Sequence, residues 1–447
     1  MTKVITYGTF DLLHNGHLQL LKRAKKLGDF LIVGVTADSF DQARGKINVQ
    51  QNLSERIANI KATGLADQII VEEYEGQKID DIRRFNIDIF AVGSDWNGKF
   101  DYLKDYCQVI YLDRTQGISS SQLRTNKNKL RIGIIGRSYH VYKFIRESRF
   151  INGVKIIGLC TDERRPFSVE IDSSIIVTND FDELLKKVDA LYITSKIDKH
   201  FSQIKQALKE KKHVLCEMPI TLDAKEYDVL SNLAEEQNCI LMPALKTAYA
   251  TAYYRLLLLI KSGRIGDVVA VDSVCTSLAS QNNLKNHKKL DVWGSMEAWG
   301  AIAILPIFQI LGTNYQSKIT ISKKFDKSDS FDLFTKTDYV FNHATGSFMV
   351  GKGIKSEGQL IISGTMGYVI VPAPWWKTDY FEIRYENSQN NKRVFYQLEG
   401  EGIRYEILAF MKGIELGNSN QYISSSVTRK ICNEFKDYYQ QKYLINI

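Results

Sequence analysis

Two series of alternating strand and helix patterns follow one another along the chain, and they constrain its fold more than any other feature. In the first series, the apolar runs VITY, FLIVGV, QIIVEEY, IDIFAVG and QVIYL are separated by segments with helical spacing, such as residues 17–27, 54–64 and 78–85. Strands and helices that alternate at this spacing predict a doubly wound parallel sheet. Ligands of such sheets bind beyond the carboxyl ends of the strands.

A polar run, TNKNKL at residues 125–130, separates this series from the second one, which begins with LRIGIIG and continues through VKIIGLC, ALYITS and HVLCEMP. From about Val268 the strands become longer and interleave polar with apolar residues, which is typical of an antiparallel sheet. The chain of 447 residues is also too long for one compact core. We therefore expect two α/β domains, residues 1–126 and 130–247, followed by an α+β domain with an open antiparallel sheet, residues 248–447.

Charge and cysteine content narrow the class of protein. The net charge is 59 − 51 = +8, and because the basic residues are scattered, nucleic acid is not an expected partner. The six cysteines form no CxxC pair, which indicates reduced thiols. The most apolar run, residues 301–311, is shorter than a bilayer span and contains Pro306, and no signal sequence opens the chain. We expect a cytoplasmic protein with no membrane partner.

The stretch GTFDLLHNGH joins the first strand to the first helix. Free backbone N–H groups and the positive end of the helix dipole meet at a helix start and favour an anion there. Gly16 lets a phosphate approach the backbone, and His14 and His17 are spaced to share one face of the helix. Two imidazoles so placed can donate hydrogen bonds to a phosphate chain as charge develops. The pattern predicts a catalytic phosphate site, and a pair of capping or core histidines is the alternative.

Together with NIDIFAVGSDWNGKFDYLKD and YLDRTQGISSSQLR, this stretch resembles the nucleotidyltransferase superfamily with an H-x-G-H signature. Within it, residues 1–124 resemble the glycerol-3-phosphate cytidylyltransferases. The resemblance implies that a phosphate oxygen of the acceptor attacks the α-phosphorus of CTP in line, while pyrophosphate leaves with Mg²⁺. It also implies a CDP-polyol product for cell-wall or capsule polymers.

The resemblance further implies a role for each matching residue. The catalytic residues are expected to be His14, His17, Lys46 and Arg114. The nucleotide is expected to contact Thr9, Phe10, Gly16, Asp95, Thr115, Ser119 and Ser120, and the acceptor phosphate Arg44 and Arg56. Gly64 stands where this family usually carries an arginine, and Tyr74 where an indole is common. Another small polyol phosphate as acceptor, or ATP in place of CTP, therefore stays open.

The second series opens with RIGIIGRSYH between a strand and a helix, the context of a dinucleotide-binding fingerprint. Of the fingerprint glycines, Gly133 and Gly136 are present, whereas Ser138 takes the second position. Asp162 closes the next strand, where a carboxylate would bind the adenosine ribose and favour NAD over NADP.

Residues 130–445 resemble the glucose–fructose oxidoreductase and inositol dehydrogenase family through ALYITSKIDKHFSQIKQALKEKKHVLCEMPIT, LLLLIKSGRIGDVVAVDS and EGIRYEILAFMKGI. The resemblance implies a Rossmann domain with a site that includes Glu217, and a sheet that carries substrate and oligomer contacts. We therefore expect a homo-oligomer. Met218 stands where that family has a lysine, and its later aspartate and histidine fall on Ala298 and Ile302.

These losses predict a dehydrogenase body that no longer transfers hydride and that scaffolds, dimerises or senses a ligand. The alternative is a bifunctional enzyme whose second part reduces a keto-sugar phosphate with NAD(P)H and passes the alcohol to the first. His200, Glu297 and Tyr253 would then be the replacements for the missing groups, although each is better explained as a structural residue.

Overall fold

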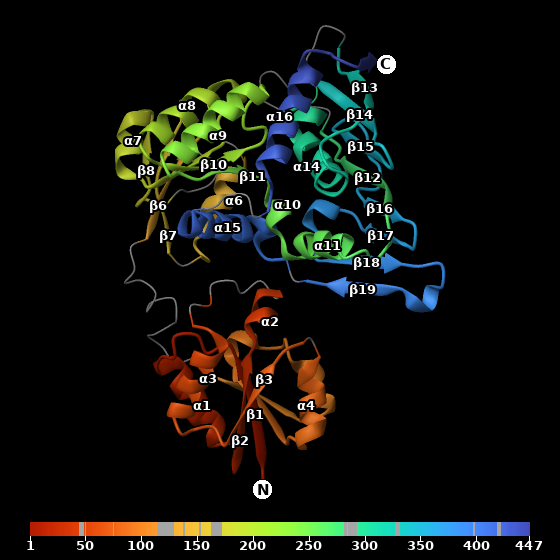
Figure 1. Cartoon of the computed structure of the whole chain (residues 1–447). Helices are drawn as coiled ribbons and strands as arrows, with labels where there is room; N and C mark the ends of the chain where they lie inside the picture. The colour runs from red at the N-terminus through yellow and green to blue at the C-terminus, as the bar shows by residue number, and fades with distance from the viewer. Residues whose placement is uncertain are drawn as a thin grey trace. The chain divides into compact units, whose positions relative to one another are not determined.

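The computed structural model divides into two compact units, residues 1–129 and 130–447 (Figure 1). The residues that it describes are 1–43, 49, 51–74, 76–113, 129–136, 139–151, 153–161, 172–280, 284, 293–326, 331–396, 398–417 and 422–447. The boundary that we expected at 247–248 falls inside helix α10 (Lys246–Tyr249), within the second unit.

The first unit is built on a five-stranded parallel sheet in the order β3-β2-β1-β4-β5. Its strands are β1 (Lys3–Gly8), β2 (Phe30–Thr36), β3 (Gln68–Glu72), β4 (Ile89–Gly93) and β5 (Gln108–Leu112). The helical elements are α1 (Asn15–Lys25), α2 (Asp38–Ala43), α3 (Leu53–Ala62), α4 (Gln77–Phe85), η1 (Ser94–Trp96) and η2 (Asp101–Asp105).

The side chains of alternate strand residues point to opposite faces of the sheet and form two separate hydrophobic cores in this unit. Val4 and Val33 point to the face that packs against α1 and α3 through Leu21 and Ile60. The neighbouring Ile5 points to the opposite face, which is covered by α4 and η2. Because both faces are covered, the strands are apolar along nearly their whole length, which is why their sequence pattern was readable.

A second parallel sheet opens the second unit, with six strands in the order β11-β10-β9-β6-β7-β8. The strands are β6 (Leu130–Ile135), β7 (Val154–Cys160), β8 (Ile176–Thr178), β9 (Ala190–Ile193), β10 (His213–Glu217) and β11 (Leu241–Ala244). The helices are α6 (Tyr139–Ser148), α7 (Phe181–Lys187), α8 (Ile197–Lys209) and α9 (Ala224–Glu236). The two predicted doubly wound sheets are thus confirmed.

The rest of the second unit is a nine-stranded sheet in the order β19-β18-β17-β16-β12-β15-β14-β13-β20. Its strands are β12 (Val268–Thr276), β13 (Ser317–Lys324), β14 (Asp332–Val340), β15 (Thr345–Gly351), β16 (Leu360–Gly364), β17 (Tyr368–Val371), β18 (Tyr380–Arg384), β19 (Lys392–Phe395) and β20 (Leu444–Asn446). Most neighbours are antiparallel as expected, but β12 with β15 and β13 with β20 run parallel, so the sheet is mixed.

Helices and turns complete this part of the fold, which Figure 1 shows in green to blue. They are α11 (Thr251–Lys261), α14 (Ser295–Leu311), α15 (Ile403–Leu416), α16 (Ser425–Tyr439), and the turns η4 (Trp375–Lys377), η5 (Ser388–Asn390) and η6 (Gly400–Gly402). Helix α14 lies against β12, β14 and β15 and buries most of its length. Within the described ranges, no helix combines the length and apolar character that crossing a bilayer requires.

Candidate active site

Helix α1 begins just beyond the carboxyl end of β1, where the order of the first sheet reverses. Strand β2 lies on one side of β1 and β4 on the other. The crevice at such a switch point is where doubly wound sheets bind ligands. The stretch GTFDLLHNGH leads from β1 into α1, and η1 follows β4 directly. The backbone of Asp95 lies in η1, so it belongs to the same edge of the sheet as the start of α1.

His14 is the N-cap residue of α1. Its backbone is extended, and its Nδ1 accepts a hydrogen bond from the backbone N–H of Gly16 at 3.0 Å. Because Nδ1 is an acceptor, the neutral imidazole carries its proton on Nε2, where it can be donated to a phosphate oxygen. His14, which we expect to contact phosphate, therefore also caps α1 through its hydrogen bond with the backbone of Gly16.

The imidazole of His17 stacks on that of His14. The ring centroids are 3.9 Å apart and the ring planes differ by 23°. The Phe10 ring meets the His17 ring edge-on at 5.4 Å between centroids, which limits how far the imidazole can turn. Both histidines are half-buried. The structure thus brings the two imidazoles together at the helix start.

The side chains of Thr9 and Phe10 point inward, which differs from the expectation that they line a triphosphate. Thr9 donates its hydroxyl hydrogen to Asp41 Oδ1 at 3.0 Å, and the Phe10 ring lies in the core beside α1, only 2% exposed. Phe10 and Leu12 both have left-handed backbone angles, with φ of 53° and 48°. These angles are unfavourable for side chains with a Cβ, so surrounding contacts must hold the loop in this form.

Gln51 supplies part of that support. Its side-chain oxygen accepts from the backbone N–H of Leu12 at 2.9 Å, and its own N–H donates to Asp11 Oδ1 at 3.0 Å. Asn52 then caps α3 in a reciprocal pair with Glu55. The loop after β1 and the start of α3 are therefore fixed to each other.

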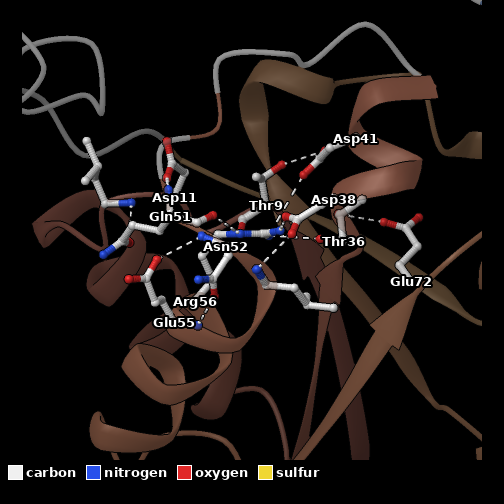
Figure 2. A network of polar contacts seen from close by, with 12 residues as sticks. Thr9, Asp11, Thr36, Asp38, Asp41, Gln51, Asn52, Glu55, Arg56 and Glu72 are labelled. Atoms are coloured by element: carbon white, nitrogen blue, oxygen red, sulfur yellow. Dashed lines mark hydrogen bonds and ion pairs between the residues drawn. The ribbon is translucent and has the colours of Figure 1, made fainter. Parts of the chain in front are cut away.

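Arg56 lies at the centre of this polar network (Figure 2) and is fully buried. Its Nη1 donates to the carbonyl oxygens of Thr9 and Thr36 at 2.6 and 2.9 Å, and its Nε to that of Gln51 at 3.1 Å. Its Nη2 pairs with Asp38. We expected Arg56 to hold the acceptor phosphate, and this role stays a prediction, because in the structure the guanidinium is engaged within the protein. The guanidinium is inaccessible because it connects the ends of β1 and β2 to α2 and α3.

The remaining expected residues of the first unit lie outside the described residues. They are Arg44, Lys46, Arg114, Thr115, Ser119 and Ser120, and they stay predictions. Gly64 has a backbone reason for its identity, since it follows the end of α3 with a φ of 66°, which glycine adopts without strain. Tyr74 is half-exposed and donates to Asp80.

A buried polar cluster on the α4 face of the sheet was missed from the sequence. Lys78 and Glu72 form a buried ion pair, and Thr36 donates to Glu72 at 2.8 Å. Beside them Tyr7 donates to Asp81 at 2.8 Å, and burial together with this carboxylate raises the pKa of the Tyr7 hydroxyl. The available signal was the pair of charged residues three apart on α4, Lys78 and Asp81.

A hollow of about 590 Å³ opens between the loop after β1 and α3. It is lined by Leu12, Leu13, Gln51, Asn59, Ala62 and Thr63. Its polar rim comes from the amides of Gln51 and Asn59, which are hydrogen bonded to each other at 3.1 Å. The hollow adjoins the residues that lead into the helix start at His14.

In the second unit, Gly133 and Gly136 occupy the carboxyl half and end of β6, between β7 and β9. Gly136 has a φ of 104°, and a Cβ there would lie 2.6 Å from the backbone nitrogen of Ser195. The glycine therefore permits a close approach between the turn after β6 and the end of β9. Ser138 and Asp162, the other fingerprint positions, are outside the described residues.

Glu217 ends β10 and accepts a hydrogen bond from the hydroxyl of Tyr192 on β9. Burial and the charge of Glu217 raise the pKa of Tyr192 well above its usual value. The next residue, Met218, packs against the apolar core. The methionine thus has a packing role at the position where a lysine was expected by resemblance.

His200, Tyr253 and Glu297 were considered as replacements for the family's missing lysine, aspartate and histidine. Two of them are buried structural residues and the third lies on the surface. His200 is buried between the carbonyl oxygens of Ser195 and Pro219, at 2.9 and 3.2 Å, and burial lowers its pKa. Tyr253 is also buried and donates to Gln309 at 2.8 Å. Glu297 is exposed in the first turn of α14.

The first unit thus places two stacked imidazoles at a helix start, at the switch point of a five-stranded parallel sheet, as expected for an α/β nucleotidyltransferase. The cytidylyltransferase-like family model matches residues 5–126. Glycerol-3-phosphate cytidylyltransferase of Bacillus spizizenii is 48% identical over 130 residues, which are 29% of this chain and 100% of that protein. The enzyme of the same name from Staphylococcus aureus is 46% identical over 124 residues, 28% of this chain and 93% of that protein. Through its first unit, the chain belongs to the cytidylyltransferase-like family.

The second unit is similar to a different group of proteins. The model of the oxidoreductase family with an NAD-binding Rossmann fold matches residues 130–245. A 3-ketoreductase from Actinomadura kijaniata, solved with NADP and TDP-benzene, has a TM-score of 0.59 and 14% identity, covering 72% of this chain and 99% of that one. An oxidoreductase from Agrobacterium radiobacter, solved with NAD⁺, L-tartaric acid and magnesium, has a TM-score of 0.57 and 15% identity, with 70% and 96% coverage. These structures show the fold of the second unit.

Proposed function

We propose that the first unit transfers a cytidylyl group from CTP to glycerol 3-phosphate, or to a close polyol phosphate, and releases pyrophosphate. The observation that carries the proposal is the pair of stacked imidazoles at the start of α1. The likeness to two curated cytidylyltransferases over nearly their whole length supports the choice of substrates. A CDP-polyol made in this way would serve cell-wall or capsule polymers.

In the proposed reaction, a phosphate oxygen of the acceptor attacks the α-phosphorus of CTP. The new P–O bond forms as the bond to the β-phosphate breaks, and the electron pair leaves with pyrophosphate. The Nε2–H of His14 and the ring of His17 donate hydrogen bonds to phosphoryl oxygens as negative charge builds on them. The backbone N–H groups of the first turn of α1 add a favourable dipole. The hollow beside Leu12 and Asn59 is the proposed position of the acceptor's carbon chain.

Magnesium enters this proposal as part of the substrate. Within the described ranges, no group of three histidine, cysteine, aspartate or glutamate side chains could hold a metal ion. In the proposal, the metal arrives on the triphosphate, where it would neutralise the leaving pyrophosphate.

An assay of pyrophosphate release tests the substrates. The full chain is incubated with CTP or ATP and with glycerol 3-phosphate, ribitol phosphate, erythritol phosphate or glycerol 2-phosphate. We expect release with CTP and one terminal polyol phosphate. Pyrophosphate release with ATP but not with CTP would indicate adenylyl transfer instead. No release with any combination of nucleotide and acceptor would contradict the proposal.

A nicotinamide dinucleotide in the second unit is a separate proposal. It is supported by the family match and by Gly136, whose backbone turns at the switch point between β6 and β9. Glu217 and Tyr192 at the same edge are the described residues that would orient a bound ring. When bound, the cofactor would supply hydride chemistry, as the bifunctional alternative requires. Quenching of tryptophan fluorescence by NADH tests binding, and NADH oxidation with keto-sugar phosphates tests turnover.

A further inference from the structure

Three lysines from separate segments of the second unit meet on a single carboxylate oxygen. The Oε2 atom of Glu401 lies 2.7 Å from Lys143 Nζ, 3.2 Å from Lys246 Nζ and 3.1 Å from Lys377 Nζ. Lys143 lies in α6, Lys246 begins α10 and Lys377 ends η4. The side chains of Lys143 and Lys246 are 15% and 14% exposed, whereas those of Glu401 and Lys377 are 31% and 36% exposed. The fold therefore brings three ammonium groups together around the Glu401 carboxylate.

This lysine cluster belongs to the carboxyl edge of the six-stranded sheet. Lys246 follows the last residue of β11 by two positions, and Glu217 ends the neighbouring β10. Gly402 lies directly against Lys246, because an added Cβ would be 3.2 Å from its carbonyl oxygen. The carboxyl edge is where doubly wound sheets bind ligands, so the cluster occupies a position suited to substrate.

Glu401 is held in an unfavourable backbone conformation. Gly400, Glu401 and Gly402 have φ values of 56°, 55° and 91°, all in the left-handed region that favours glycine. Although burial raises it, hydrogen bonds from Lys143 and Lys377 and the charge of Lys246 lower the pKa of Glu401 to about 2. The lysines thus favour a negative charge at this position. The glycines on each side of Glu401 permit left-handed angles where the turn closely approaches Glu147 and Lys246.

Two other features lie beside the lysines, a pair of indoles and a buried carboxyl group. The indoles of Trp376 and Trp299 lie 4.9 Å apart, and Thr247, next to Lys246, donates to the carbonyl of Trp376 at 3.0 Å. Trp376 is buried and Trp299 is partly buried, so the pair makes the surroundings of Lys377 apolar. Trp376 is also the chain neighbour of Lys377, so indole and ammonium groups come from one turn.

The second feature is Glu406 on α15. It is 3% exposed, and its Oε2 has no hydrogen-bond partner among the residues with described positions. Burial and the neighbouring charge of Glu217 raise its pKa well above the usual value, whereas the charge of Lys246 lowers it. A buried carboxyl group without a partner is costly, and a hydroxyl group of a ligand would satisfy it.

We propose that Lys143, Lys246 and Lys377 bind the phosphate group of a small phosphorylated polyol or ketose, at the position that the Glu401 carboxylate occupies in this structure. A phosphate monoester has three terminal oxygens, so each lysine would gain an acceptor of its own in place of the one oxygen that they share. The choice of a polyol rests on the proposed function of the first unit, whereas the anion site does not. The second unit would then handle the same class of compound as the first.

Titration calorimetry with inorganic phosphate, without CTP, tests the anion site in the full chain. We compare the wild type, Glu401→Gln, the double variant Glu401→Gln/Lys246→Met, and Glu399→Gln as the matched control. Glu399 lies in the same segment but pairs with Arg404 at 2.8 Å. Since Glu401 competes for the lysines, its removal should tighten phosphate binding at least about tenfold. The control should bind like the wild type, and the double variant should lose the gain.

Equal phosphate affinity in Glu401→Gln and the wild type would overturn the proposal and leave the lysines as a structural clasp for the η6 turn. If Glu401→Gln unfolds in dilute buffer, phosphate should restore folding where chloride at matched ionic strength does not, and failure of this rescue would also overturn it. Displacement of bound phosphate by NADH but not by glycerol 3-phosphate would assign the lysines to the cofactor and overturn the substrate assignment. None of these outcomes depends on cytidylyl transfer, so failure of the proposed function is separately detectable.

Discussion

Replacement of Arg56 by methionine removes the group that joins four segments of the first unit. The guanidinium donates to the backbone carbonyls of Thr9, Thr36 and Gln51 and pairs with Asp38. It is fully buried, so water cannot take over these bonds in the variant. Asp41, also fully buried, lies 3.9 Å from Nη1 and would lose a neighbouring cation. Each change favours the unfolded state.

The expected loss is about 3–5 kcal/mol, because the buried Asp41 loses its neighbouring cation and three backbone carbonyls lose their donor, whereas Asp38 is partly exposed. The first unit spans 129 residues, and the entropy of unfolding is about 2.1 cal/mol/K per residue. Division of the free-energy loss by this entropy gives a decrease in the unfolding midpoint of about 11–18 °C. The midpoint of the second unit should stay unchanged.

Hydrogen exchange measured by mass spectrometry in increasing guanidinium reports on each unit through its own peptides. Lys61→Met is the matched control, because Lys61 lies on the same helix, α3, and is exposed. A loss no larger than that of the control would refute the structural role that we assign to Arg56. Unchanged stability together with weaker binding of glycerol 3-phosphate would restore Arg56 as an acceptor-binding residue.

Three further predictions concern the helix cap, the second sheet and the lysine cluster. His14→Asn keeps a side chain that can cap α1, so the thermal unfolding midpoint should stay unchanged. The turnover number should fall at least about a hundredfold, which stopped-flow measurement of pyrophosphate release would detect. Gly136→Ala should destabilise the second unit by about 2–4 kcal/mol in guanidinium titration, because its Cβ clashes with the backbone of Thr194 and Ser195 just after β9. Gly64→Ala, with open space around the Cβ, should cost the first unit about 1 kcal/mol. The pKa of Glu401 is lowered to about 2 from an unfolded value of 4.5, so its stabilising contribution is complete above pH 4.5 and is lost as the pH falls toward 2. The stability difference between wild type and Glu401→Gln should therefore narrow between pH 5 and pH 3, and a constant difference would contradict this assignment.

The parallel sheets and the helix start at His14 could be predicted because their signals are local. Parallel strands buried on both faces give continuous apolar runs, and the histidine–glycine–histidine spacing lies directly after one of them. The mixed character of the third sheet was harder to predict from the sequence, since β12 and β15 are far apart in the chain and their parallel pairing has no local signal.

The burial of Arg56 could not be read from the sequence. Its acceptors are mostly backbone carbonyls at strand ends, which every residue carries, so no side-chain pattern marks them. The burial of the Phe10 ring was equally hard to predict, because the left-handed backbone angle at this residue is not marked by a glycine. Lys143 and Glu401 are 258 residues apart in the sequence, and only the folded chain brings the three lysines and the carboxylate together.

The central claim is that the histidine pair at the start of α1 holds and breaks a triphosphate. The most direct measurement is the rate of pyrophosphate release from CTP with glycerol 3-phosphate, in the wild type and in His17→Ala, with thermal midpoints recorded for both. The account predicts brisk release by the wild type and a loss of at least about a hundredfold in the variant at an unchanged midpoint. Equal rates in the two proteins would contradict it.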